Sequence, residues 1–242
     1  MTEYDTEAVV TEGQCLCGDV RYRAEGDCFG LIHCHCRRCR KHTGASVVSY
    51  VVFAETARLQ WISGKDKLVS FRGRAFCPVC GSGMPSSNGD DTKFGNVYAG
   101  NSLTMAPVKG HFYLYTGSRA PWTETPPPEL PQWDTAIDPP EVEELDRYQE
   151  VGRITGSCLC GEVSYAAVNP LGMMNCHCTR CRLSRSAAHA TNLFVNEDDF
   201  EWRAGEKLLR RYKLPEADRF GTAFCRACGS PMPLIGVQSS CR

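Results

Sequence analysis

The stretch that decides the fold is His33-Cys34-His35-Cys36-Arg37-Arg38-Cys39-Arg40-Lys41-His42. It places three thiols at C-x-C-x-x-C spacing inside a basic segment. Three thiolates this close together can hold one Zn²⁺ and leave its fourth tetrahedral position free, as in reactive zinc sites. A related stretch, Cys176-His177-Cys178-Thr179-Arg180-Cys181-Arg182, follows later in the chain. The sequence therefore predicts a reactive metal site and a second cluster of the same kind.

The chain is an internal duplication. Four blocks occur twice in the same order: GQCLCGDV (13–20) and GSCLCGEV (156–163), the two C-x-C-x-x-C clusters, QWISGK (60–65) and EWRAGE (201–206), and AFCPVCGS (75–82) and AFCRACGS (223–230). A fixed order of matched blocks indicates two copies of one unit. We predict a first zinc domain over 11–134, a proline-rich and acidic linker over 135–152, and a second zinc domain over 153–242.

The composition is that of a soluble globular protein, with 42% apolar and 23% charged residues in 242. No run of about 18 apolar residues predicts a membrane helix, and the acidic residues 1–7 do not resemble a secretory signal. We therefore expect a cytoplasmic protein, in which thiols stay reduced. The formal charge of −1 becomes about −7 if fourteen thiolates hold four zinc ions. That balance argues against non-specific nucleic-acid binding.

Sixteen cysteines in such a protein predict metal sites rather than disulfides. A bridge between Cys15 and Cys17 would also close a strained ring. Each copy holds seven repeated cysteines, which divide into four and three. Each group of four cysteines consists of two short pairs, which the fold can bring together as a closed, structural Cys₄ zinc site. These groups are Cys15, Cys17, Cys77 and Cys80 in the first copy, and Cys158, Cys160, Cys225 and Cys228 in the second. Gly18 and Gly81 follow the thiols where a metal knuckle needs a permissive backbone.

The groups of three cysteines are Cys34, Cys36 and Cys39 in the first copy, and Cys176, Cys178 and Cys181 in the second. One interpretation is a second structural zinc, completed by His33, His35, His42 or Cys28. The other leaves the fourth position for water or an incoming thiolate. Arg37, Arg38, Arg40 and Lys41 would then lower the thiolate pKa and attract an anionic thiol, although such residues also commonly form a solvated basic face. Cys28 and Cys241 have no counterpart in the repeat and are interpreted as spare thiols.

The secondary-structure signals are mostly short strands, which suits a small β domain reinforced by metal. We expect strands over 20–23, 47–53, 96–99 and 111–115, a hairpin formed by 59–62 and 68–71, and one helical turn over 37–42. The second copy has no counterpart of the late strands. Either a partner supplies them or this unit is incomplete.

The motifs G-x-C-x-C-G, C-H-C-x-x-C-R-K-x-T-G, W-x-x-G and F-C-x-x-C-G resemble the glutathione-dependent formaldehyde-activating enzyme family, which includes centromere protein V and has the Mss4-like fold. The resemblance covers Gly13 to about Trp133 and Gly156 to about Met232. It implies two tandem Mss4-like β domains, the second truncated, with one structural and one labile zinc each. It also implies a carbon–sulfur lyase that joins glutathione to formaldehyde, giving S-hydroxymethylglutathione. Cys34, Cys36 and Cys39 would then hold the catalytic zinc, with glutathione near Arg37–Lys41.

The second copy departs from the family motif. Ser184-Arg185-Ser186 stands where the first copy has His42-Thr43-Gly44, and Asn175 replaces His33. We predict that its cluster of three cysteines still binds zinc but is catalytically weak or silent. The alternatives to an enzyme of thiols and aldehydes are a non-catalytic zinc-binding module for protein interaction and a zinc or redox sensor. An enzyme needs an open coordination position and a pocket, whereas an interaction module needs neither.

Overall fold

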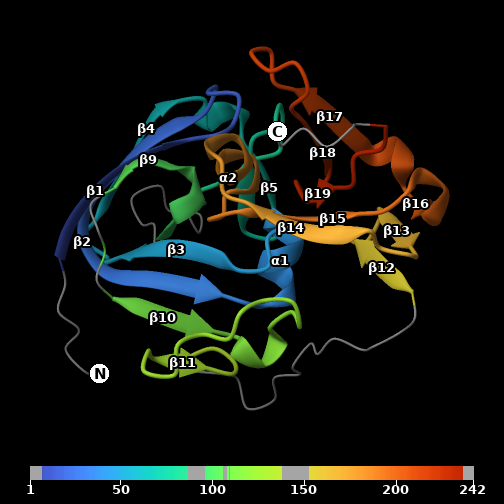
Figure 1. The fold of residues 1–242 in the computed structure, drawn as a ribbon. Coiled ribbons are helices and arrows are strands. Elements are labelled where there is room, and N and C mark those ends of the chain that lie inside the picture. The colour runs from blue at the N-terminus through green and yellow to red at the C-terminus, as the bar shows by residue number, and fades with distance from the viewer. Residues whose placement is uncertain (1–6, 87–95, 106–107, 109, 138–152, 237–242) are drawn as a thin grey trace.

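The computed structural model describes residues 7–86, 96–105, 108, 110–137 and 153–236. These residues form a mainly β structure in which each copy carries one short helix, as Figure 1 shows. The predicted fold class is thereby confirmed. Residues 138–152 of the predicted linker and Cys241 lie outside the described residues.

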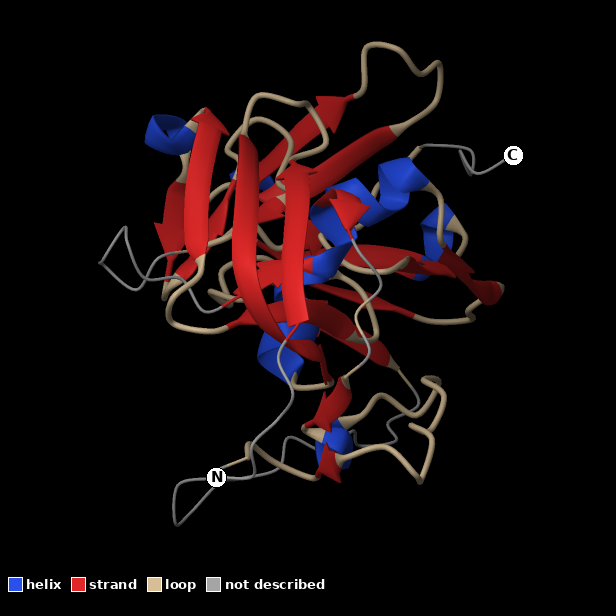
Figure 2. Cartoon of the chain, turned by 90° about the vertical axis from the view of Figure 1, so that its left-hand side faces the viewer, coloured by secondary structure: helices blue, strands red, loops and turns tan. Residues whose placement is uncertain are grey.

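The first copy is built on one large sheet. Its elements are β1 (Glu7–Gln14), β2 (Arg21–Cys34), α1 (Arg37–Thr43), β3 (Val48–Phe53), β4 (Arg58–Ser63), β5 (Val69–Phe71), β6 (Arg74–Phe76), β7 (Gly83–Met84), β8 (Asn96–Tyr98), β9 (Ser102–Met105), β10 (His111–Leu114) and β11 (Gln132–Trp133). The long strand β2 pairs with β1, β3, β4 and β10, so it organises the sheet. Figure 2 shows the long strands of this sheet side by side. Strands β5, β6 and β7 form a separate small sheet that carries Cys77 and Cys80 at its connection.

The second copy repeats this order in smaller sheets. Its elements are β12 (Ile154–Ser157), β13 (Ser164–Ala167), β14 (Gly172–Cys176), α2 (Thr179–Arg185), β15 (Ala190–Phe194), β16 (Phe200–Ala204), β17 (Leu209–Lys213), β18 (Gly221–Cys225) and β19 (Pro231–Met232). Strands β13 and β14 correspond to the two ends of β2. They are separated at Asn169, which has a positive φ of 47°, and at the following Pro170. A positive φ and a missing N–H both interrupt a strand, and this explains why the second sheet is divided.

Each helix begins at a cysteine of its own cluster. Cys36 is the N-cap of α1, and its Sγ accepts a hydrogen bond from the backbone N–H of Cys39 at 3.3 Å. Gly44 ends the helix in the left-handed conformation, with φ of 67°, as helices commonly end. Cys178 takes the same place before α2. The predicted helical turn over 37–42 is confirmed, and the N-cap and first turn of each helix bring together the two cysteines of its C-x-x-C segment.

The predicted hairpin between 59–62 and 68–71 is wrong. Both segments are strands, but β4 pairs with β2, whereas β5 pairs with β6. Gly64, with φ of 71°, begins a short 3₁₀ turn over Lys65–Lys67 that sends the chain from one sheet to the other. The pairing depends on residues distant in the sequence, and local strand and turn signals do not contain that information. The predicted strand over 20–23 is only the beginning of β2, which continues to Cys34.

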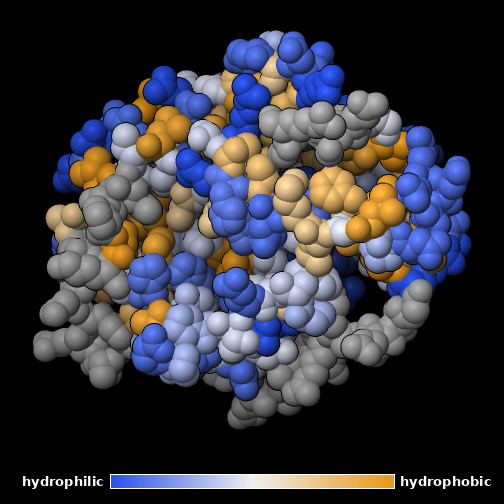
Figure 3. Space-filling view, viewed as in Figure 1, coloured by the Kyte–Doolittle hydropathy of each residue, from blue (hydrophilic) through white to orange (hydrophobic). Residues whose placement is uncertain are grey.

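In the first copy, strands late in the sequence extend the main sheet, and no counterpart of them occurs among the described residues of the second copy. Strand β10 pairs in parallel with β2 at Leu31–Cys34, and β8 pairs with β3. Within the described residues no strand follows β19. The corresponding edge strand β14 therefore leaves apolar side chains in solvent, and orange atoms gather over this region in Figure 3. The residues concerned are Leu171, Met173, Met174 and Leu193.

The two copies pack on each other through reciprocal contacts. Phe76 and Phe224 occupy equivalent positions and meet edge to face, with ring centroids 6.4 Å apart. A side chain at Gly81 would clash with Phe224, and one at Gly229 would clash with Phe76. Each phenylalanine thus packs against the glycine of the opposite copy. This reciprocal contact indicates that an approximate twofold axis relates the two copies. Buried residues of both copies share one hydrophobic cluster.

Replacing Gly100 by alanine is expected to destabilise the packing of the first copy on the second. A Cβ at Gly100 would lie 2.2 Å from the backbone nitrogen of Ala187 in the second copy, where only backbone movement can make room. We expect a loss of about 1–3 kcal/mol, the usual cost of overpacking, measured as a lower urea midpoint of the zinc-loaded chain. Gly172→Ala is the matched control, because a Cβ there meets nothing within 4 Å. Equal midpoints for the two variants would contradict the close contact between the copies.

Candidate metal centres

The two groups of four cysteines come together as predicted. In each copy one pair lies just before the second strand (β2 or β13), and the other pair begins at the end of β6 or β18. The ligand atoms within each group lie within 4.8 Å of one another. The groups are Cys15, Cys17, Cys77 and Cys80, and Cys158, Cys160, Cys225 and Cys228.

The spacing of the sulfur atoms fits a shared metal ion. Cys17 Sγ lies 3.7 Å from Cys77 Sγ, and Cys160 Sγ lies 3.8 Å from Cys225 Sγ. A tetrahedral zinc with Zn–S bonds of about 2.3 Å separates its sulfurs by about 3.8 Å, whereas a disulfide needs about 2.05 Å. None of the fifteen described cysteines forms a disulfide. The donor set and its spacing therefore fit zinc.

Backbone and serine groups hold the thiols in place. The N–H of Val20 donates to Cys15 Sγ at 3.4 Å, and Gly81 takes a φ of 81° that allows the turn after Cys80. Neighbouring thiols, Cys15 first among them, donate to Cys80 and lower its pKa. Ser82 Oγ accepts from the N–H of Leu16 at 3.0 Å and lies 3.3 Å from Cys80 Sγ. Ser230 makes the same two contacts in the second copy.

Sequence reasoning assigned no role to these serines, although the repeat of Cys-Gly-Ser in both copies was a signal that could have found them.

The three-cysteine cluster of the first copy lies between β2 and α1. Cys34 ends β2, Cys36 caps α1 and Cys39 lies in its first turn. Their three sulfur atoms lie within 4.8 Å of one another. Cys34 and Cys39 are buried and Cys36 is partly exposed. The cluster can therefore hold a metal ion and still be reached from one side.

A guanidinium contacts this cluster directly. Arg74, in β6, donates from Nη2 to Cys39 Sγ at 3.2 Å and from Nη1 to Tyr50 Oη at 3.0 Å. Tyr50 Oη lies 3.3 Å from Cys39 Sγ. Hydrogen bonds from Cys34 and Cys36, together with the charge of Arg74, hold the pKa of Cys39 well below its usual range. Sequence reasoning missed Arg74 and Tyr50, because each reaches Cys39 only through the folding of distant strands.

The histidines and Cys28 do not complete this cluster. Among the described residues, each group of possible ligands that includes Cys34 contains only the three cysteines. His33 instead hydrogen-bonds to Ser49 and His111, at 2.8 and 2.9 Å. Cys28 is hydrogen-bonded to the backbone of Gly30. The interpretation that leaves the fourth position open is the one that this arrangement fits.

Most of the basic residues near the cluster contact protein acceptors. Arg38 donates to the carbonyl of Arg72, and Arg40 donates to the carbonyls of His35 and Ser118 at 3.0 and 3.1 Å. Lys41 donates to Ser157 Oγ of the second copy at 2.6 Å. Arg37 is exposed. These contacts give three of the four residues a structural role, and their contact with a thiol substrate stays a prediction.

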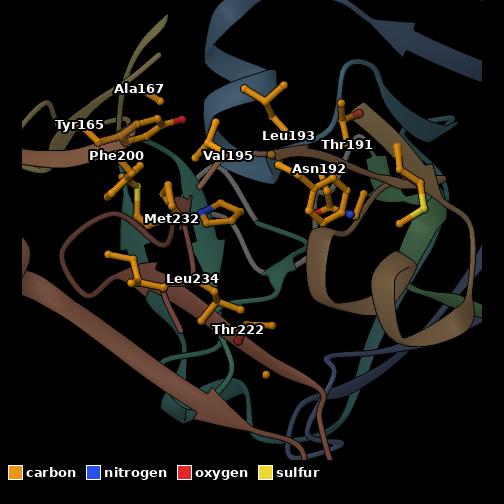
Figure 4. Close-up of a pocket in the computed structure, with 18 of the residues that line it drawn as sticks. Tyr165, Ala167, Thr191, Asn192, Leu193, Val195, Phe200, Thr222, Met232 and Leu234 are labelled. Carbon is orange, nitrogen blue, oxygen red and sulfur yellow. The ribbon is translucent and has the colours of Figure 1, made fainter. Parts of the chain in front are cut away.

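The three-cysteine cluster of the second copy is more open. Cys176, Cys178 and Cys181 also have their sulfurs within 4.8 Å of one another, but Cys178 is exposed. Two positions around it differ: Thr222 stands where the first copy has Arg74, and Asn192 stands where it has Tyr50. A cavity of about 690 Å³ lies beside Cys181, and Figure 4 shows part of its wall.

A comparison with protein families gives one match, described as glutathione-dependent formaldehyde-activating enzyme, over residues 10–117 and 153–240. The chain belongs to this family. The two matched segments correspond to the two copies and confirm the resemblance found in the sequence. The family comparison, with the four cysteine clusters, supports a zinc-binding member of the family. No curated protein matches the chain.

None of the helices in the described part of the chain has the length and apolar character needed to cross a membrane.

Proposed function

We propose that the protein is a zinc-dependent carbon–sulfur lyase. It joins glutathione, or a similar thiol, to formaldehyde or another small aldehyde, and Cys34, Cys36 and Cys39 hold the zinc of the reacting site. The observation that carries this proposal is the cluster of three sulfur atoms, which no fourth described cysteine or histidine completes. Membership of the family supports the choice of substrates.

The reaction adds the thiol across the carbonyl group of the aldehyde. The sulfur forms a bond to the carbonyl carbon, and the proton that the thiol loses is balanced by one taken up at the carbonyl oxygen. When bound, zinc supplies Lewis acidity and favours the thiolate form of a bound thiol. Arg74 keeps a positive charge against Cys39, which balances part of the negative charge of three thiolates. Partial exposure of Cys36 provides the access that two substrates need.

The first copy is the better candidate for catalysis. It retains Arg74 and Tyr50 at Cys39. Its late strand β10 pairs with β2 up to Cys34, and β8 pairs with β3 at Tyr50. The second copy has neither of these two side chains and has no such strands within its described residues. We also propose a cytoplasmic location, where the described cysteines, none of which forms a disulfide, would stay reduced.

Replacing Cys36 by serine is expected to remove catalysis by the zinc-loaded protein. Exchange NMR of glutathione with formaldehyde measures the effect as acceleration above the uncatalysed rate. The variant should lose this acceleration by at least about a hundredfold, since even removing a group that only orients a metal ligand costs about 10–100-fold. Cys178→Ser is the matched control in the second copy and should retain most of the acceleration. The proposal fails if Cys36→Ser remains as active as the wild type, or if fully zinc-loaded wild type gives no acceleration.

A further inference from the structure

The cavity in the second copy has walls that are mostly apolar, with several polar side chains and one cation among the described residues that line it. Figure 4 shows Tyr165 and Phe200 on one side and Thr191 and Asn192 on the other, with Leu234 and Thr222 below. Among the described residues of the lining, Arg185 is the one basic residue and Glu197, which is exposed, is the one acidic residue. At about 690 Å³ the cavity has the size of a small-molecule site.

The cavity is present because the second copy has smaller side chains where large side chains of the first copy pack against the third cysteine. There, Arg74 and Tyr50 press against Cys39, and Tyr98 of β8 packs on Tyr50 with ring centroids 5.0 Å apart. The corresponding positions in the second copy hold Thr222 and Asn192, both of which line the cavity. The space beside the third cysteine is therefore occupied by protein in one copy and open in the other.

In the second copy, the arginine near the third cysteine of the cluster comes from a different element than in the first copy. Arg185 ends α2 and stands where the first copy has Thr43, whereas Thr222 stands where it has Arg74. The Nη1 atom of Arg185 lies beside Gly44 of the first copy. A Cβ added at Gly44 would be 3.2 Å from this nitrogen. The guanidinium therefore reaches the seam between the copies at the wall of the cavity.

No hydrogen bond or ion pair of the Arg185 side chain occurs within the described residues. It lies near enough to Cys181 for electrostatic attraction, but Arg74 in the first copy goes further and donates to Cys39 Sγ. A guanidinium has five N–H donors, and Arg185 is a half-buried residue, so its donors can be reached from the cavity. The donors of Arg185 are thus available to a ligand in the cavity.

We propose that this cavity is a binding site for a small amphipathic monoanion, a carboxylate with an alkyl or aryl body, held by Arg185. A carboxylate can accept two parallel N–H bonds from one guanidinium, and the apolar walls bury the body of the ligand. Glutathione fits less well, because it carries two carboxylates and the lining offers one cation. The site is separate from the reacting site proposed for the first copy and does not depend on the thiol–aldehyde reaction.

Isothermal titration calorimetry of the zinc-loaded full chain with 4-phenylbutyrate tests this proposal. The neutral 4-phenylbutanamide has a similar body and should bind at least about tenfold more weakly, since a hydrogen bond to a charged group contributes about 1.5–3 kcal/mol. Arg185→Gln should weaken 4-phenylbutyrate by a similar factor. Arg180→Gln, an exposed arginine on the same helix that does not line the cavity, should leave it unchanged. Equal binding of the two probes, or no binding of 4-phenylbutyrate by the folded wild type at 10 mM (about the weakest affinity that such contacts would give), would overturn the proposal.

A second variant keeps the test decisive if Arg185→Gln does not fold. Asn192→Tyr restores the side chain that the first copy has at this place, so it should fill the cavity and abolish binding while the chain stays folded. Unchanged affinity in folded Asn192→Tyr would place the ligand elsewhere and overturn the proposal. Cys36→Ser should bind 4-phenylbutyrate like the wild type, so failure of the proposed lyase activity and failure of this site give different results.

Discussion

Replacing Cys80 by serine is expected to abolish the folded state of the first copy. Cys80 is buried in the Cys₄ group and precedes Gly81, where an added Cβ would clash with Phe224 of the second copy. A structural zinc in a small domain contributes about 10 kcal/mol or more of folding free energy, and the whole net stability of a domain is about 5–15 kcal/mol. Near-ultraviolet circular dichroism and zinc stoichiometry of the purified chain measure the loss of fixed packing and of bound metal.

Cys28→Ser is the control for this experiment. Cys28 is as buried as Cys80, but it belongs to none of the four clusters and contacts the backbone of Gly30. We expect this variant to keep its zinc and to lose about 0.5–3 kcal/mol of folding free energy, the usual range for a single substitution. If Cys80→Ser gave the same spectrum and zinc content as Cys28→Ser, the Cys₄ group would not be a structural metal site.

The cysteine clusters could be predicted from the sequence because their geometry is largely local. In C-x-C and C-x-x-C segments the spacing itself brings two thiols to one side of a turn, and the duplication shows which pairs belong together. The helical turn that begins at Cys36 follows from the same spacing. Fold class was accessible for a related reason, since short β-rich segments and metal knuckles together leave few architectures for units of this size.

The surroundings of the clusters could not be predicted in this way. Arg74 contacts Cys39 only because β6 folds against α1, and its thirty-five-residue separation leaves no local signal. The same limitation applies to the hairpin expected around Gly64, whose two strands join different sheets. Arg185 was visible as a departure from the motif in the sequence, but its position in a cavity depends on Thr222 and Asn192, which come from two other strands.

Replacing Arg74 by methionine is expected to weaken zinc binding at Cys34, Cys36 and Cys39 by about ten- to a hundredfold, the usual effect of removing a group that orients metal ligands. Methionine keeps much of the apolar volume but removes the guanidinium that donates to Cys39 Sγ and Tyr50 Oη. Three thiolates and one zinc ion together carry a net negative charge, and without Arg74 this charge would lie unbalanced beside the buried Tyr98. The measurement is competition for zinc by a colorimetric chelator at pH 7.

Arg58→Met is the matched control, because Arg58 is an exposed arginine on β4 that lies in none of the clusters. By the same reasoning, the cluster of the second copy, which has Thr222 in place of Arg74, should release its zinc early in the wild type and in both variants. Arg74→Met should release one further equivalent early, whereas the wild type and Arg58→Met should not. If Arg74→Met released its zinc like the control, the guanidinium would be a packing residue, and the charge balance assigned to it at the reacting site would be wrong.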